Sequence, residues 1–120
     1  MEREAPNIEQ VREFLLSYRL CVEMLDLRKY ERKRIGDGEL PACCEDILAG
    51  DETYWRIRLH EVNALVGNMK NSREKLILYY HYIRGLSVER AANLLGVSRR
   101  TGYRLHQKGL QIAARLYRQG

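Results

Sequence analysis

Apolar residues near the start of the chain recur at alternating steps of three and four positions. The series consists of Ile8, Val11, Leu15, Tyr18, Val22 and Leu25. A helix completes one turn every 3.6 residues, so this spacing places all six on one helix face, whereas a strand would need a period of two. Asn7 stands just before the series and is expected to cap the helix. We predict one long helix over residues 8–34.

A second series with the same period follows and comprises Trp55, Leu59, Val62, Val66 and Met69. It predicts a helix over residues 53–70, which we expect to run antiparallel to the first and to seal the two apolar seams together. A homodimer formed through the same N-terminal helices would use these seams equally well. Residues 35–52 carry three glycines and a proline without sustained periodicity, and are expected to form a loop with at most one short turn near 45–48.

Serine and glycine divide the rest of the chain into short helices. Ser72, Ser87 and Ser98 each stand where a helix is expected to start, while Gly85 and Gly96 stand where one is expected to stop. The chain holds only two prolines. We therefore predict an all-α fold, with a helical hairpin or arm over residues 1–70 and a second helical domain over residues 71–120, the last helix running from 99 to about 117.

Composition excludes several classes of protein. No run of 18 apolar residues is present, so no membrane span is expected. The charged segment 1–6 does not resemble a secretory signal. The three cysteines, Cys21, Cys43 and Cys44, form an odd set with two adjacent members, which suits a reducing cytoplasm better than a disulfide framework. We expect a cytoplasmic protein.

Charge is distributed unevenly along the chain. Residues 1–60 hold ten basic and thirteen acidic side chains, whereas residues 61–120 hold eleven basic and only three acidic ones. From Arg84 onward, Glu89 is the single acid. A strongly basic half beside a mildly acidic half favours a polyanionic partner for the C-terminal part.

The segment 87–105 has the residue types that a helix-turn-helix needs. Ala92 is small, as required where two helices cross closely, and Gly96 can take the left-handed conformation of the turn. Val97 is expected to fill the corner between the helices, and Ser98 to cap the second one. Arginine bonds guanine edges in bidentate fashion, glutamine pairs with adenine, and further cations neutralise phosphates. We predict a double-stranded DNA site made of Ser87, Ser98, Arg99, Arg100, Thr101, Tyr103, Arg104, Gln107 and Lys108.

The same residues resemble a known family. The segments 82–87, 91–92, 95–98, 103–104 and 109–110 are similar to region 4 of the sigma-70 family, over about residues 73–117. That module recognises the −35 promoter element and contacts the flap of the RNA polymerase β subunit, so the resemblance implies a promoter-like DNA element and RNA polymerase as partners. It also implies base-reading roles for Arg99, Arg100 and Arg104, and an activator-contact position at Lys108.

Several features depart from that family. An acidic residue is common where this chain has Arg100, a branched apolar residue where it has Gly102, and alanine where it has Gly109. We expect the two glycines to allow close approach of a neighbouring helix or to leave the last helix soft until DNA orders it. In addition, residues 1–70 do not look like the region that melts the −10 element. A helical arm before such a module is similar to small phage and prophage regulators of late genes, of the ArpU and RinA kind.

Two other functions fit the same residues. One is the small subunit of a phage terminase, a DNA-packaging adaptor that forms rings. The other is a protein-only adaptor that docks on RNA polymerase without binding DNA. The operator sequence, the direction of regulation and the oligomeric state do not follow from the sequence.

We find no pattern typical of an enzyme or a cofactor protein. His60, His81 and His106 are not at metal-ligand spacing with the cysteines, and a zinc site at Cys43 and Cys44 is less plausible than ordinary loop thiols. No glycine-rich phosphate loop or nucleophile elbow is present. We expect no catalytic activity, no metal and no cofactor.

Overall fold

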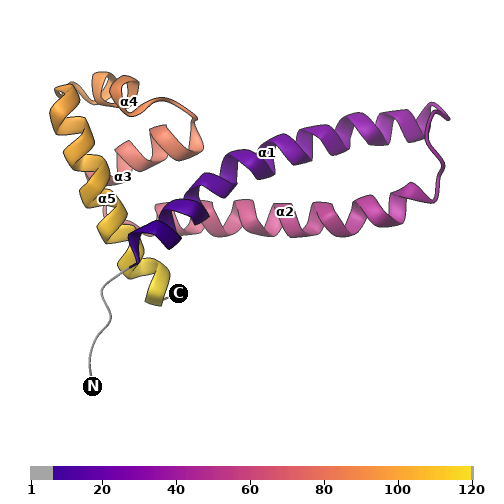
Figure 1. The fold of residues 1–120 in the computed structure, drawn as a ribbon, viewed down its shortest axis with the longest axis horizontal. Coiled ribbons are helices and arrows are strands. Elements are labelled where there is room, and N and C mark those ends of the chain that lie inside the picture. The colour runs from indigo at the N-terminus through magenta and orange to yellow at the C-terminus, as the bar shows by residue number, and fades with distance from the viewer. Residues whose placement is uncertain (1–6, 120) are drawn as a thin grey trace.

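The chain forms a helical structure with two distinct parts (Figure 1). The structure is a computed structural model that describes residues 7–119, apart from the side chains of residues 46–48 and 118–119. Its helical segments, in chain order, are α1 (Ile8–Gly36), α2 (Cys44–Gly67), α3 (Arg73–Leu78), the π-helical segment η1 (Tyr79–Ile83), α4 (Val88–Leu95) and α5 (Arg99–Gln119). Residues 7–119 contain no strand, which confirms the predicted all-α class. Within them, no helix has the length and apolar character needed to cross a membrane.

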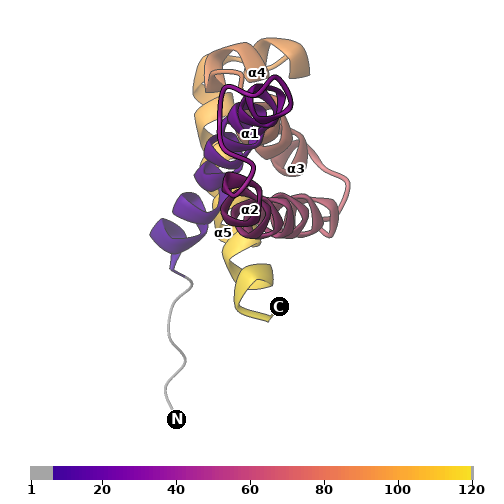
Figure 2. The same ribbon diagram turned by 90° about the vertical axis from the view of Figure 1, so that its right-hand side faces the viewer.

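Helices α1 and α2 lie side by side and project together from the rest of the molecule (Figures 1 and 2). α1 begins where the apolar series predicts, and the side chain of Asn7 accepts a hydrogen bond from the backbone amide of Gln10 at 3.0 Å. The chain reverses direction after Gly36, with Gly38 in the left-handed conformation at φ 81°. The two apolar series therefore face one another within a single chain.

The segment 44–52 corrects the prediction of a loop over residues 35–52. α2 begins at Cys44 and continues through Gly50, so helix replaces the expected loop. The acids of this first part of α2 are bound by α1: Arg28 contacts Asp51 at 3.0 Å, and Arg32 contacts Glu52, which is only 8 % exposed. Such tertiary contacts override the low helix propensity of glycine. α2 also ends at Gly67, slightly before the predicted position 70.

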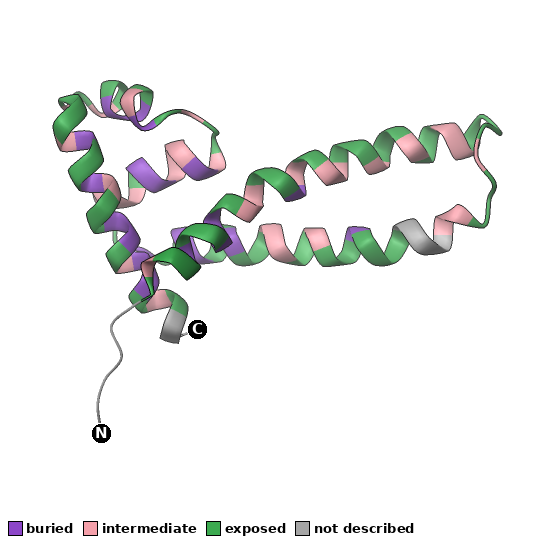
Figure 3. Cartoon of the chain, in the orientation of Figure 1, coloured by how far each residue is buried: buried purple, intermediate pink, exposed green. Residues whose placement is uncertain are grey.

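The main core lies where the inner ends of α1 and α2 meet α3, η1 and α5. Buried side chains concentrate there, while the far half of the α1–α2 pair is mostly exposed or half-buried (Figure 3). Members of this core come from all parts of the chain and include Val11, Leu15, Val62, Val66, Ile77, Leu78, Tyr82, Ala91, Leu105, Leu110 and Ala113. Because the first turns of α1 contribute to this core, they hold the projecting pair against α5 and η1.

Candidate nucleic-acid interface

Two capped helices joined by a tight turn form the segment predicted to bind DNA. The side chain of Ser87 accepts a hydrogen bond from the amide of Arg90 at 3.1 Å and caps α4. Gly96 ends α4 with φ 71°, in the left-handed region that glycine adopts without steric cost. Ser98 then accepts from the amide of Thr101 at 3.1 Å and caps α5. All three positions match their predicted local roles.

Helices α4 and α5 cross closely because the two residues at their contact, Ala92 of α4 and Gly102 of α5, are small. A Cβ atom built on Gly102 would lie 2.6 Å from the Cβ of Ala92. Further along α5, a Cβ on Gly109 would lie 3.0 Å from both the carbonyl oxygen of Glu74 and the Cγ of Leu78. Both glycines are buried. The two glycines were expected either to allow close approach of a neighbouring helix or to leave the last helix soft. The structure shows the close approach.

The opposite side of α5 presents a row of exposed polar side chains. Arg100, Arg104 and Gln107 follow one another at steps of four and three, so they lie on one face of the helix, about half a turn from the buried Gly102. Lys108 is exposed beside this row. None of these four side chains makes a hydrogen bond or an ion pair with the residues that the structure describes. Three cations and one amide therefore point into solvent from the first turns of α5.

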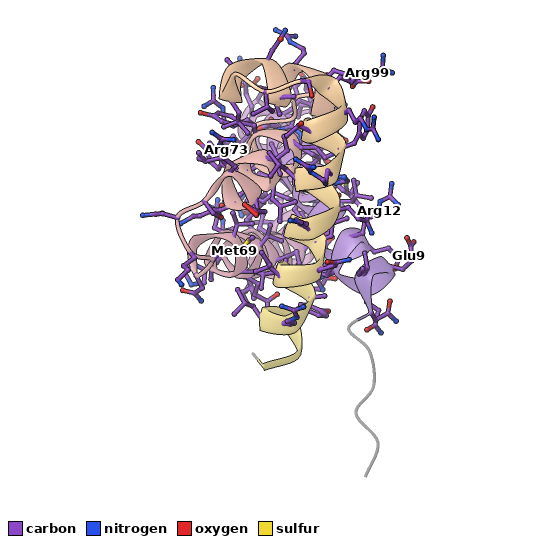
Figure 4. All side chains as sticks on the ribbon, turned by 90° about the vertical axis from the view of Figure 1, so that its left-hand side faces the viewer. Glu9, Arg12, Met69, Arg73 and Arg99 are labelled. Atoms are coloured by element: carbon purple, nitrogen blue, oxygen red, sulfur yellow. The ribbon has the colours of Figure 1, made fainter. Side chains whose placement is uncertain are left out.

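Arg99 and Tyr103 lie on the flank of the row and are both bound to Glu89 of α4. The Tyr103 hydroxyl donates to Glu89 Oε2 at 2.6 Å, and Arg99 Nη2 lies 3.4 Å from the same oxygen. The hydrogen bond from Tyr103 lowers the pKa of the Glu89 carboxyl below its ordinary value, and the same bond raises the pKa of the Tyr103 hydroxyl. These two predicted site residues thus have an acidic partner within the chain (Figure 4 labels Arg99).

The serine and threonine hydroxyl groups predicted to contact DNA form hydrogen bonds near the starts of their own helices. Ser87 and Ser98 are exposed but serve as helix caps, and Ser98 Oγ donates to Thr101 Oγ1 at 3.0 Å. Thr101, in the first turn of α5, is half-buried. A capping oxygen can still approach a phosphate, since the first amides of a helix favour anions. The structure places these three residues at the rim of the exposed row rather than in it.

A cavity lies beside the row, between the first turns of α1 and the α4–α5 unit. It has a volume of about 560 Å³ and is lined in part by Glu9, Arg12, His81, His106 and Gln107. Figure 4 shows Glu9 and Arg12 on the same side of the molecule as Arg99. The cavity thus separates the start of α1 from the exposed face of α5.

One hydrogen bond in this region ties η1 to α5, and another ties η1 to the segment that leads into α4. Tyr82 Oη and His106 Nε2 share a hydrogen bond of 2.7 Å, and His81 Nδ1 donates to the carbonyl of Leu86 at 2.6 Å. Burial of the imidazole, with the nearby charges of His81 and Arg12, lowers the pKa of His106 to about 4. Burial likewise raises the pKa of the Tyr82 hydroxyl. At neutral pH the His106 ring is therefore uncharged, and it links η1 to α5 without adding charge to the interface.

Two contributions to this surface were missed by sequence reasoning. Glu89 was noted only as the last acid of a basic region, and its role as acceptor for two residues depends on the angle at which α4 crosses α5. Gln111 is exposed and continues the row one turn beyond Gln107. The step of four from Gln107 to Gln111 is the signal that would have identified it.

The described residues contain no group of three or more histidine, cysteine, aspartate or glutamate side chains that could hold a metal ion. Cys21 is buried, while Cys43 and Cys44 lie at the turn between α1 and α2, far from the α5 row along the chain.

Comparison of the chain with family models, curated protein sequences and solved structures gives no match.

Proposed function

We propose that this protein is a sequence-specific, duplex-DNA-binding transcription regulator that acts at a promoter-like element. The observation that carries the proposal is the row of unpaired polar side chains on α5, supported from behind by the close crossing of α4. A helix with exposed arginine and glutamine side chains on one face can enter the major groove, where these residue types read guanine and adenine. The resemblance to sigma-70 region 4 supports the same function and adds RNA polymerase as a proposed partner.

The roles within the row differ by position. Arg100 and Arg104 point directly away from the buried side of α5 and are the proposed base-reading residues, with Gln107 beside them. We propose that Lys108, which is exposed beside the row, neutralises a phosphate. Arg99, which the resemblance also implies as a base reader, must first leave Glu89. We therefore propose a smaller and more sequence-tolerant contribution from Arg99 than from Arg100.

Selection of bound sequences from a random pool of duplex DNA tests the proposal. The full chain is expected to enrich one short motif, and its affinity for that motif should fall steeply with salt, because phosphate contacts release condensed counterions. Arg100→Ala and Arg104→Ala should each relax the preference at defined base pairs by about 1–3 kcal/mol. Arg115→Ala is the matched control, since it removes an exposed arginine from the same helix about three turns beyond Arg104.

Failure of this experiment has a clear meaning. Enrichment of no motif, or equal base preferences in both row variants and the wild type, would reject the proposed reading of sequence by α5. Polymerase binding with no salt-dependent DNA affinity would instead favour the protein-only adaptor. A ring of eight or more subunits would favour the packaging adaptor.

A further inference from the structure

The two sides of the α5 row differ in charge. In Figure 4, α5 lies in front, with Glu9, Arg12 and Arg99 on one side of it and Met69 and Arg73 on the other. The first side is formed by the starts of α1 and α4, and the second by the turn between α2 and α3 with the first turn of α3. We call them the α1 flank, made of residues 8–13 and 87–89, and the α3 flank, made of residues 68–75.

The α1 flank has no excess of positive charge. Its acids are Glu9, Glu13 and Glu89, and its single cation is Arg12, which lies 3.5 Å from Glu9. Glu89 is bound to Arg99 of α5. A phosphate that approached this side would meet cations that already have carboxylate partners. We therefore expect a DNA duplex to make few backbone contacts with the α1 flank.

The α3 flank is basic. It contains Lys70, Arg73 and Lys75 against one acid, Glu74, which is half-buried. Lys75 Nζ donates to the carbonyl oxygen of Gly67 at 3.3 Å. The side chains of Lys70 and Arg73 are exposed, and neither makes a hydrogen bond or an ion pair with residues 7–119 as the structure describes them. Both cations can therefore meet an anion from outside the chain.

Gly109 brings the α3 flank next to the row. A Cβ built on Gly109 would lie 3.0 Å from the carbonyl oxygen of Glu74, so the first turn of α3 packs directly on α5. Successive residues of a helix are about 100° apart, which places the exposed Lys108 between the row and this contact. Gln107 lies on the opposite side and lines the cavity of the α1 flank together with Arg12. Positive charge thus extends from the row through Lys108 toward the α3 flank.

We propose that the α3 flank binds the sugar–phosphate backbone of the DNA duplex through Lys70 and Arg73. The inference rests on the proposed reading of DNA by α5, and it adds the side on which the duplex is held. A helix in the major groove has a phosphate backbone on each side of it, and cations that meet phosphates fix the register of the protein without reading the sequence. Charge assigns this role to the α3 flank and not to the α1 flank, so the interface is asymmetric.

Removal of two charges from the α3 flank tests this inference. Lys70→Gln with Arg73→Gln changes two exposed positions and should keep the helical circular dichroism. On the motif that the wild type selects, this variant should keep the same base preferences, while the slope of log affinity against log salt should become shallower by about 2. Lys29→Gln with Lys33→Gln is the matched control, because it removes two exposed lysines from the last turns of α1, at the projecting end of the α1–α2 pair.

Hydroxyl-radical footprinting on the same motif locates the contact. The wild type and the control variant should protect the DNA backbone on one side of the motif, and the α3-flank variant should lose that protection. A salt slope that is unchanged in the α3-flank variant, or reduced equally in the control, would overturn the inference while leaving the reading of DNA by α5 intact.

Three other outcomes would also overturn the inference. A changed base preference in the α3-flank variant would mean that the flank reads bases. Loss of RNA polymerase binding with an unchanged salt slope would assign the flank to a protein partner. Absence of DNA binding by the wild type would overturn this inference and the proposed function together.

Discussion

The contact between Gly102 and Ala92 yields the sharpest stability prediction. In Gly102→Ala the new methyl group would lie 2.6 Å from the Ala92 Cβ, closer than carbon atoms can approach. Alanine gains about 1 kcal/mol over glycine in helix propensity. Overpacking a close helix contact costs about 1–3 kcal/mol, because two helix backbones must separate to relieve it. The expected net effect is a destabilisation of up to about 2 kcal/mol.

The control is a glycine of the same chain in open space. Gly50 lies inside α2, and a Cβ built there meets nothing within 4 Å. Gly50→Ala should therefore stabilise the protein by up to about 1 kcal/mol. Urea unfolding followed by circular dichroism measures both changes, and in thermal unfolding 1 kcal/mol should move the midpoint of a chain of this size by roughly 3–6 °C. The two alanine substitutions are expected to have opposite signs.

A double variant tests whether the loss of stability comes from the contact between Ala92 and Gly102. In Ala92→Gly with Gly102→Ala, the methyl group moves from one helix to the other and the overlap disappears. The double variant should thus be more stable than the sum of the single changes predicts, by about 1 kcal/mol or more. Equal stabilisation by Gly102→Ala and Gly50→Ala, or strict additivity in the double variant, would refute the close-packing explanation.

Three further predictions concern the caps and titrating groups. Ser98→Ala removes the cap of α5 and should cost about 1 kcal/mol in urea unfolding, without changing the slope of the transition. The folded chain holds His106 at a pKa of about 4, below the ordinary 6.5, so the unfolded chain binds more protons between these values. The free energy of unfolding should keep its full value above pH 6.5 and fall as the pH drops toward 4, by about 1–2 kcal/mol after allowance for solvent screening. His106→Gln should flatten this pH dependence. If the pH dependence is unchanged in that variant, a group other than His106 causes it. Tyr103→Phe removes the hydrogen bond to Glu89, so carbon-detected NMR titration should show the pKa of the Glu89 carboxyl rising toward its ordinary value; an unmoved pKa would contradict the main cause assigned to it.

Local sequence signals were sufficient for much of this fold. Asn7, Ser72, Ser87 and Ser98 each accept a hydrogen bond from an amide three residues later, as capping predicts. The left-handed Gly96 follows from the same local logic. Such features depend on neighbours in the chain, so they can be recognised without knowledge of the tertiary structure.

The misses arose where distant segments decide the conformation. The start of α2 at Cys44 depends on ion pairs with α1, and the periodic apolar signal is absent there. The π-helical segment η1 coincides with the bond between Tyr82 and His106, which are 24 residues apart. For the candidate site, sequence alone identified the exposed row, whereas the link from Arg99 and Tyr103 to Glu89 required the crossing geometry of two helices.

The pairing of Arg99 with Glu89 has a consequence for the thermodynamics of the proposed DNA binding. A free arginine that meets a phosphate displaces condensed salt ions, and each such contact steepens the salt dependence by about 0.9 in logarithmic slope. Arg99 arrives with a carboxylate of its own chain as its counterion, so its exchange to a phosphate leaves that carboxylate near the DNA. The net charge delivered by the pair is zero. The salt slope should therefore count Lys108 but not Arg99, and Glu89→Gln should make binding both tighter and more sensitive to salt.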